Sequence, residues 1–387
     1  MKKKSDLLLI GYWLLFLAFS LYCYVFLDVG LTLTSFKPYL QFQKQMRYFG
    51  NSNRPLSTIL FLVLSCFLFV VYYLLIKSFK KKKVLLTRVL LFSFLIAGVL
   101  ILAYPAFSHD IFNYIFNAKM VLVYQADPHY QTANQFADPM VDFMRNVHTP
   151  APYFYGWTLI SLIPYFFSFQ RIFLSLINFK LLAGFFYFFT FAVLKKVIKK
   201  LNLPQLNLRL ALFLLNPLIL IEAIAVGHND LAMMMPALLS FYYLFKFKKR
   251  RKMADLLFSI FLFASSVSIK YATIALLPLF VIWFFKPKLD LGFWGAVVLF
   301  LLPFSRPLDQ LHSWYFIWPL SWAFLSKNIK VIYFACFVSF FSLLRYAPYI
   351  WQGNWDPPVH FLRLVIYFAL PLVSLPYFIL VSQNKKK

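Results

Sequence analysis

The sequence predicts an all-α, polytopic membrane protein, and three observations point to this fold class. Of the 387 residues, 62% are hydrophobic and only 13% are charged, and the mean hydropathy is +0.73. Soluble domains usually contain about 45–50% apolar and about 25% charged residues, so an ordinary water-soluble fold is excluded. The apolar residues also form stretches long enough to cross a bilayer as helices, and short basic runs separate these stretches.

About twelve of these stretches are expected to span the bilayer. The first follows a basic start, as in a signal peptide, but it is too long and lacks a small-residue cleavage site, so we expect a retained anchor. Residues 157–168 are expected to form a re-entrant or interfacial helix, because a full span there would put Lys195–Lys200 on the outer side. The expected spans are 6–27, 55–78, 86–106, 172–194, 207–224, 229–245, 253–268, 271–285, 289–304, 313–326, 329–345 and 360–382.

The net charge of +27 comes mainly from basic runs between the apolar stretches. Cytoplasmic loops of membrane proteins retain such residues, so the pattern puts both termini in the cytoplasm of a multi-pass plasma-membrane protein, with membrane lipids as partners. No basic surface interleaved with aromatic residues is visible in the sequence, so a nucleic-acid partner is not expected. The runs are Lys2–Lys4, Lys77–Arg88, Lys195–Lys200, Lys246–Lys252, Lys286–Lys288, Lys327–Lys330 and Lys385–Lys387.

With this topology, most other ionisable residues fall on the outer side. All six histidines and nine of the twelve carboxylates are there. Longer outer loops would produce the same distribution, and a functional site at the outer face is the alternative. The residues are Asp28, Asp110, Asp127, Asp138, Asp142, Glu222, Asp230, Asp309, Asp356, His109, His129, His148, His228, His312 and His360.

The longest loop covers residues 107–156, and long ordered loops are usually functional. Apolar residues recur at helical spacing from Phe107 to Tyr124, which predicts an amphipathic helix along the membrane interface. Asp110 and His109 open this loop. An ionisable pair at the end of a span is a functional candidate, although Asp110 could instead be the N-cap of the expected helix.

A second candidate is the segment Gly227–Asp230, which interrupts about 30 apolar residues. A tight turn between two spans is the simple reading, but Gly and Asn would suffice for a turn, and His228 and Asp230 would then be unnecessary. Glu222 lies about one and a half turns before this segment, near the expected hydrocarbon boundary. We therefore expect these residues to belong to the outer site.

Two basic residues, Lys270 and Arg306, depart from the positive-inside pattern because they fall on the outer side. Each could extend to lipid headgroups, or could bind an anionic group such as a phosphate. His312 lies nearby in the sequence, in a segment rich in Trp and Tyr. An interfacial aromatic belt explains those aromatic residues, but it does not explain His312.

Carboxylates, histidines and outward cations at one membrane face suit transfer of a sugar from a lipid phosphate. The attacking hydroxyl needs a carboxylate base, and the departing phosphate needs a cation. The sequence carries no zinc-ligand spacing, nucleophile elbow or phosphate-cradling glycine loop, which disfavours a nucleotide-sugar site. The alternatives are a transporter or flippase of a lipid-linked sugar, whose ionisable residues would lie near mid-membrane, and an envelope scaffold.

These segments resemble, in order over about residues 100–320, the motifs of a known family. It comprises bacterial polyprenol-phosphate-mannose-dependent α-mannosyltransferases, integral membrane enzymes of the GT-C superfamily. The matching segments are Asn216-Pro217-Leu218 with Glu222 and Gly227–Asp230 (N-P-L…E…G-H-N-D), Ser108–Tyr114 with Asp127–Tyr130 (S-x-D…Y…N-P-Y), His148–Trp157 (T-P…Y-G-P-x-W), Lys270-Tyr271 (K-Y) and His312–Pro319 (H-P-W-Y…W-P).

The resemblance implies a GT-C-like catalytic module over residues 86–330 with outer loop 107–156, two spans in 1–85 before it and further spans in 331–387. It implies that Asp110 is the catalytic base of an inverting hexosyl transfer, from a polyprenyl-phosphate donor to a lipid or glycan acceptor at the extracytoplasmic face. Sugar, acceptor and metal dependence stay open, and no cofactor is assigned. The implied substrate-binding residues are His109, Tyr114, Glu222, His228, Asn229, Asp230, Lys270, Tyr271, Arg306, His312, Trp314 and Tyr315.

Overall fold

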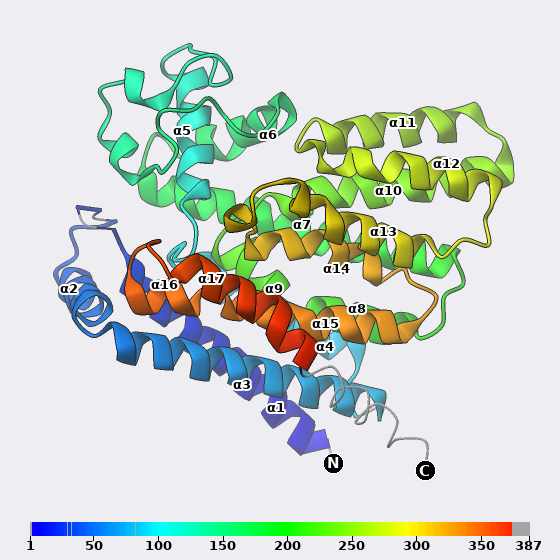
Figure 1. Cartoon of the computed structure of the whole chain (residues 1–387), viewed down its shortest axis with the longest axis horizontal. Coiled ribbons are helices and arrows are strands. Elements are labelled where there is room, and N and C mark those ends of the chain that lie inside the picture. The colour runs from blue at the N-terminus through cyan, green and yellow to red at the C-terminus, as the bar shows by residue number, and fades with distance from the viewer. Residues whose placement is uncertain (1, 29, 32, 82, 374–387) are drawn as a thin grey trace.

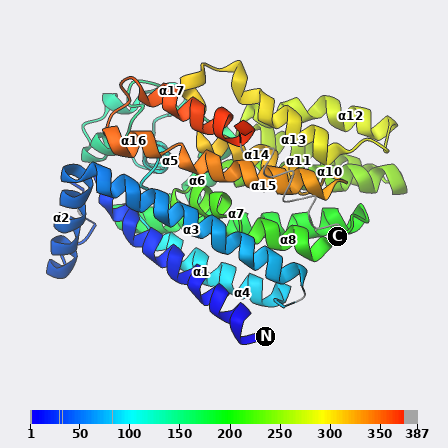
Figure 2. The ribbon, with the colours of Figure 1, turned by 60° about the horizontal axis from the view of Figure 1, so that its bottom comes forward.

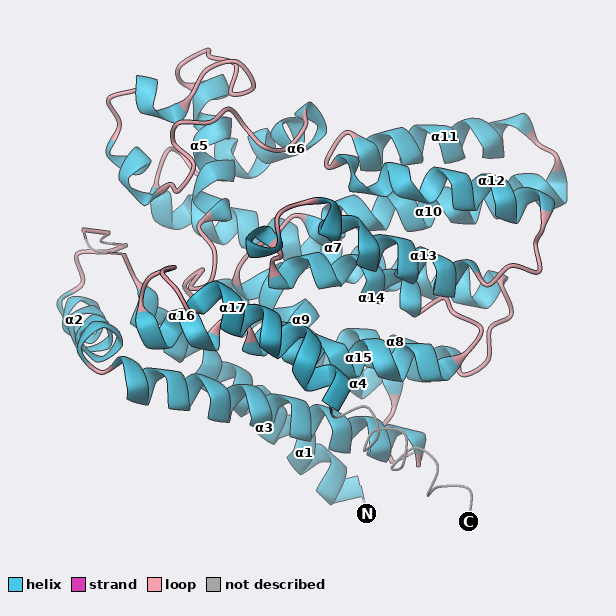
Figure 3. Cartoon of the chain, in the orientation of Figure 1, coloured by secondary structure: helices cyan, strands magenta, loops and turns pink. Residues whose placement is uncertain are grey.

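The computed structural model describes residues 2–28, 30–31, 33–81 and 83–373. The chain is 76% helical, and within these described residues there is no β-strand (Figure 3). The predicted all-α class is therefore confirmed. The last expected span, 360–382, lies partly outside the described residues, as does the basic run Lys385–Lys387.

Four helices in the described part of the chain have the length and composition of membrane spans. They are α1 (Lys2–Tyr22, continued by the turn η1, Cys23–Phe26), α3 (Arg54–Lys80), α7 (Ile172–Lys200) and α15 (Ile329–Leu344, continued by α16, Ala347–Gln352). A fifth unit is bent by 46° between α8 (Leu206–Leu214) and the pair α9 (Pro217–Ile219) and η4 (Leu220–Ala225). Pro217 explains the break, because proline lacks an N–H to continue the α8 ladder.

Most of the remaining expected spans correspond to shorter helices, so helix length does not establish the expected number of twelve. The stretch 313–326 differs most, because it contains only η8 (Ser313–Phe316) and α14 (Ile317–Ala323), too few residues for a bilayer of about 30 Å. α14 packs among α10, α13 and α15. α10 (Asp230–Arg250) has 21 residues but is not among the four span-like helices. The shorter helices are α4 (Leu86–Leu102), α11 (Met253–Val267), η5–α12 (Tyr271–Leu276, Leu277–Phe285), α13–η6 (Leu291–Leu301, Leu302–Ser305) and α17–η9 (Val359–Leu364, Val365–Ala369).

The basic loops meet at one end of the helix bundle, which is the right-hand end in Figure 1. There the cations of one loop contact carbonyl, carboxylate or aromatic groups of another. Such contacts bring together runs that are up to about 240 residues apart in sequence. They are Arg88 with Asp6, Lys80 with the ring of Tyr333, Lys248 with the carbonyl of Phe284, and Lys327 with the carbonyl of Lys288.

At the other end, residues 103–171 form a separate lobe, at the upper left of Figure 1. It contains α5 (Asp110–Leu122), α6 (Tyr155–Phe166) and the turns η2 (Ala133–Gln135) and η3 (Pro139–Phe143). α6 has 12 residues, too few for a full span, as expected for 157–168. The expected helix at 107–124 is present as α5, but nine of its 13 residues are buried, so it is a core helix of the lobe.

α2 (Lys37–Ser52) lies between the first two expected spans, where the sequence analysis expects no helix. Pro38 occupies the start of the helix, where a missing N–H costs nothing. Figure 2 shows α2 standing across the ends of α1 and α3. Gly50 permits this packing, because a Cβ atom there would lie 2.4 Å from the carbonyl oxygen of Val25.

Asp28, just after α1, ties the N-terminal helices to the lobe. Its Oδ2 accepts a hydrogen bond of 2.5 Å from the Tyr104 hydroxyl and lies 2.8 Å from Nε2 of His109. Burial alone would raise the pKa of Asp28, but the bonds from His109 and Tyr104 and the charges of His109 and Arg145 lower it overall. The end of the first helix is therefore fixed to the residue that precedes Asp110.

We expect Asp28→Asn to lower the apparent melting temperature of the protein in detergent at neutral pH. The lost contact is a hydrogen bond to a charged group, a class that contributes about 1.5–3 kcal/mol. Because the pKa of Asp28 is lowered by folding, this stabilisation is present above the carboxyl's unfolded pKa of about 3.9 and is lost as the pH falls through the folded value. The melting temperatures of wild type and variant, measured from pH 7 to pH 3, should therefore converge at the acid end, and a constant difference would contradict this account.

Candidate functional site

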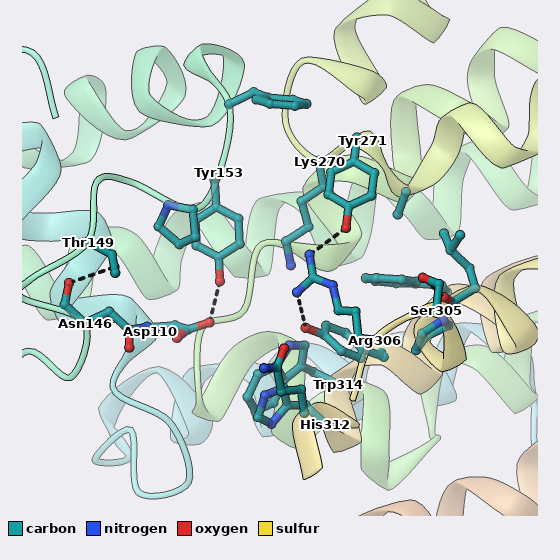
Figure 4. A pocket seen from close by; sticks show the side chains of 18 residues that line it. Asp110, Asn146, Thr149, Tyr153, Lys270, Tyr271, Ser305, Arg306, His312 and Trp314 are labelled. Carbon is teal, nitrogen blue, oxygen red and sulfur yellow. Dashed lines mark hydrogen bonds between the residues drawn. The ribbon is translucent and has the colours of Figure 1, made fainter. Parts of the chain in front are cut away.

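Asp110 is the first residue of α5, and its carboxylate points away from the helix it begins. His109 occupies the N-cap position, and no side-chain capping bond is present at this helix start. Asp110 Oδ2 instead accepts a hydrogen bond of 2.6 Å from the hydroxyl of Tyr153 in the same lobe (Figure 4). The N-cap alternative for Asp110 is therefore wrong, and the carboxylate is available to a cavity.

This cavity has a volume of about 470 Å³. It lies between the lobe and the turns that join α11 to α12 and α13 to α14. Among the described residues, seven of the thirteen expected site residues line it. They are Asp110, Lys270, Tyr271, Arg306, His312, Trp314 and Tyr315.

The lobe is joined to the bundle directly beside Lys270. The backbone N–H of Gly156, at the start of α6, donates a hydrogen bond of 2.9 Å to the carbonyl of Ser268. A Cβ atom at position 156 would lie 2.2 Å from the Ser268 hydroxyl, so only glycine allows this approach. The contact holds Tyr153 and Lys270 on one wall, with the Lys270 ammonium 4.9 Å from the centre of the Tyr153 ring.

Lys270 points inward rather than towards the headgroups. Its Nζ lies 2.8 Å from Oδ1 of Asp230, and the indole N–H of Trp318 donates to the same oxygen at 2.5 Å. The Asp230 side chain is fully buried and that of Lys270 is only 9% exposed. The snorkelling alternative for Lys270 is therefore wrong, because its ammonium is paired at the cavity wall.

Arg306 forms the outer side of the same wall. Its guanidinium donates hydrogen bonds to the hydroxyls of Tyr271, at 2.6 Å, and Tyr315, at 3.4 Å (Figure 4). Hydroxyl acceptors leave its positive charge uncompensated, in contrast to that of Lys270. Two cations thus face the cavity. Lys270 is paired with the buried carboxylate of Asp230, whereas the hydrogen-bond acceptors of the Arg306 guanidinium among the described residues are phenol hydroxyls.

His312 stacks on Trp314, with the ring centres 4.2 Å apart and the planes within 2°. Burial, and then the charges of Arg363, Arg345, His228 and Arg306, lower the pKa of His312 well below its usual value. The imidazole is therefore neutral at neutral pH and can donate one hydrogen bond and accept another.

The segment Gly227–Asp230 lies in a layer behind the cavity wall. Gly227 has a φ of +86°, so the segment does make the expected turn, at a position that favours glycine. His228 packs beyond it: its ring stacks on Trp314 with centres 4.1 Å apart, its Nδ1 lies 3.1 Å from Oε2 of Glu222, and its Nε2 lies 3.9 Å from Oδ2 of Asp110. The segment is therefore a turn whose His228 also packs behind the cavity wall, and its functional role stays a prediction.

Six expected residues do not line the cavity in the described structure. His228 and Asp230 contact residues that do line it, whereas Glu222 contacts His228 and Tyr346, which do not. Tyr114, one turn after Asp110, packs edge-on against Tyr153, with ring centres 5.3 Å apart. Asn229 is buried, and its amide has no hydrogen-bond partner among the described residues. His109 turns away from the cavity to Asp28.

The sequence analysis did not assign three residues that hold this site together. Tyr153 and Trp318, the hydrogen-bond donors to Asp110 and Asp230, lie inside segments that carry the family resemblance. Their positions could have been found from those motifs. Tyr346, whose hydroxyl donates a bond of 2.9 Å to Oε1 of Glu222, follows α15 and had no local signal.

Within the described residues, no group of three or more His, Cys, Asp or Glu side chains is arranged to hold a metal ion. The cavity wall itself contains one carboxylate, that of Asp110, among the residues that the structure describes. In the described cavity, the carboxylate of Asp110 therefore faces the cations of Lys270 and Arg306 and several aromatic rings.

An all-helical membrane bundle with a polar lobe and an ionisable cavity at one end has the features of a membrane-embedded glycosyltransferase of the GT-C type. Residues 13–286 match the family model described as alpha-(1->6)-mannopyranosyltransferase, N-terminal domain. The chain belongs to this family, and is a mannosyltransferase of the GT-C type. No curated protein and no solved structure matches the chain. The matched residues include Asp110, Lys270 and Tyr271, whereas the wall formed by Arg306 and His312–Tyr315 follows them.

We expect Asp230→Asn to lower the melting temperature of the protein more than the double variant Asp230→Asn/Lys270→Gln does. The single change leaves the Lys270 charge buried without its partner, which typically costs about 3–5 kcal/mol, whereas the double change removes both charges. Thermal unfolding in detergent measures this difference. Asp6→Asn is the matched control, because the Asp6–Arg88 pair is about 40% exposed and such pairs contribute about 0–1 kcal/mol. A larger loss of melting temperature in the double variant than in Asp230→Asn alone would contradict the coupling of Asp230 and Lys270.

Proposed function

We propose that this chain transfers mannose from a polyprenyl-phosphate carrier to a hydroxyl of a lipid or glycan acceptor, at the extracytoplasmic face of the plasma membrane. The observation that carries the proposal is that Asp110 faces Lys270 and Arg306 across one cavity, in a chain of a mannosyltransferase family. A base for the acceptor and cations for a phosphate leaving group are the two requirements of this transfer.

Asp110 is the base in this mechanism. The acceptor oxygen attacks the anomeric carbon as its proton passes to Asp110, and the bond from that carbon to the carrier phosphate breaks. A single displacement needs one carboxylate, and the described cavity wall contains one, so the expected stereochemical course is inversion. The Tyr153 hydroxyl holds the carboxylate in place by its 2.6 Å hydrogen bond.

Lys270 and Arg306 bind the carrier phosphate. Asp230 keeps Lys270 aimed at the cavity and offsets part of its charge, which allows the phosphate to leave after transfer. Arg306 keeps its full charge beside Tyr271. Phe154, Ala272, Leu302 and Pro303 provide an apolar part of the wall, suited to the first isoprene units of the carrier.

The aromatic and amide residues of the wall bind the sugar and the acceptor. Trp314 and Tyr315 offer ring faces on which a sugar can stack, and neutral His312 can both donate and accept hydrogen bonds. Asn146, Thr149 and Gln310 add hydrogen-bonding groups around the same space.

The orientation of the chain in the membrane follows from where the cations lie. The basic loops gather at the end opposite the lobe, and cytoplasmic loops retain such residues. We infer that the basic end and the N-terminus are cytoplasmic, and that the lobe and the cavity face outward. A transporter is less well supported, because the cavity lies at one end of the bundle rather than midway along it.

Asp110→Asn should reduce mannose transfer by about 10²-fold or more, because general bases contribute about 10²–10⁴-fold and an amide cannot accept the proton. The measurement is transfer from polyprenyl-phosphate mannose to octyl α-mannoside by purified protein. Asp142→Asn, an exposed carboxylate of the same lobe outside the cavity, is the control and should retain wild-type turnover. Normal turnover by the Asp110 variant would remove Asp110 from the mechanism.

The orientation predicts which cysteine variants a membrane-impermeant maleimide reaches on intact cells. In a chain carrying Cys66→Ser, Gln131→Cys in the lobe should react, and Lys249→Cys at the basic end should react only after permeabilisation. Both positions are exposed, and the two native cysteines that remain, Cys23 and Cys336, are buried. The opposite labelling pattern would mean that the cavity faces the cytoplasm.

A further inference from the structure

Glu222 and His228 resemble substrate-binding residues by their motif, but neither can touch a substrate in this structure. Both side chains are fully buried, and neither lines the cavity. His228 nevertheless lies 3.9 Å from Asp110 and stacks on Trp314, and Glu222 lies 3.1 Å behind His228. The carboxylate of Glu222 and the imidazole of His228 therefore lie behind Asp110, without access to the cavity.

Four features of the fold fix the two side chains. Glu222 lies on the π-helical turn η4, an irregularity often found at functional sites. Tyr346 donates to Oε1 of Glu222, and Oε2 lies 3.1 Å from Nδ1 of His228, an ion-pair distance without hydrogen-bond alignment among the described residues. The left-handed Gly227 turns the chain, and Trp314 covers one face of the imidazole. Nε2 of His228 is thereby directed towards Asp110.

We propose that Glu222 and His228 act through Asp110 as a buried proton relay, in which His228 takes up the proton that Asp110 removes from the acceptor. This inference rests on the proposed function and goes beyond it, because it converts two expected substrate contacts into positioning residues. In the catalytic triad of serine proteases, a buried carboxylate likewise orients an imidazole and stabilises its cation.

The acceptor O–H bond breaks as its oxygen bonds to the anomeric carbon, and the electrons of the broken sugar–phosphate bond leave with the carrier phosphate. The proton goes first to Asp110 and then to Nε2 of His228, whose Nδ1–H faces Glu222. The result is an imidazolium between two carboxylates. The 3.9 Å between Asp110 and His228 is longer than a hydrogen bond, and a small side-chain movement on substrate binding can shorten it.

The charged surroundings of His228 fit this role. Several elements pack around it, and each contributes ionisable groups. Two carboxylates lie within 4 Å of its ring nitrogens, those of Glu222 at 3.1 Å and Asp110 at 3.9 Å. The groups are Asp110 from α5, Glu222 from η4, Lys180 from α7 beside Gly227, His312 before η8, and Arg345 and Tyr346 after α15.

The test compares His228→Gln and Glu222→Gln with wild type, using polyprenyl-phosphate mannose and octyl α-mannoside. Both variants should lower kcat by about 10-fold or more and leave the KM for the donor within about 2-fold, because neither residue contacts the donor. Tyr346→Phe should have a smaller effect in the same direction.

His360→Gln is the matched control, because this histidine lies outside the cavity on α17 and should retain wild-type kcat. A raised donor KM with unchanged kcat would overturn the relay and restore the substrate-contact interpretation. A lower melting temperature, with kcat lowered and the donor KM raised together, would also overturn it, in favour of a structural role. Full activity of both variants while Asp110→Asn is inactive would refute the relay alone, whereas no mannose transfer by wild type would refute the proposed function itself.

Discussion

The pair formed by Asp230 and Lys270 is the interaction on which the cavity depends. Asp230 begins α10, Lys270 lies in the turn after α11, and Trp318 on α14 donates to the same carboxylate oxygen. Three segments of the bundle therefore meet at one buried oxygen. A buried charge is tolerated only when it is paired and hydrogen-bonded, so the pair also dictates that these segments stay together.

The all-α class could be predicted because composition and basic runs reflect the bilayer directly. The short helix 157–168 was also predictable, because the charge pattern leaves no room for another span. The extent of 313–326 was not, because hydropathy reports burial in protein and in lipid alike, and α14 is buried in protein. α2 was missed because its polar composition gives no hydropathy signal.

Within the site, the sequence indicated which residues gather but not where their side chains point. Lys270 faces inward because Asp230 attracts it, and His109 faces away because Asp28 does. Such choices depend on partners 40 to about 80 residues away. The role of Tyr346 was invisible for the same reason, since it reaches Glu222 across 124 positions of the chain.

The contact between Asp28 and His109 also shows that the N-terminal part of the chain supports the site. The helices α1 and α3 look dispensable by sequence, since they precede the lobe and the motifs. Yet Tyr12 on α1 donates a hydrogen bond to the carbonyl of Leu215, directly after α8, and Tyr72 on α3 donates to the carbonyl of Leu212 on α8. Asp28 also contacts His109, the residue before Asp110. A chain beginning at residue 86 would lose these restraints, so the N-terminal helices contribute to the position of the residues around Asp110.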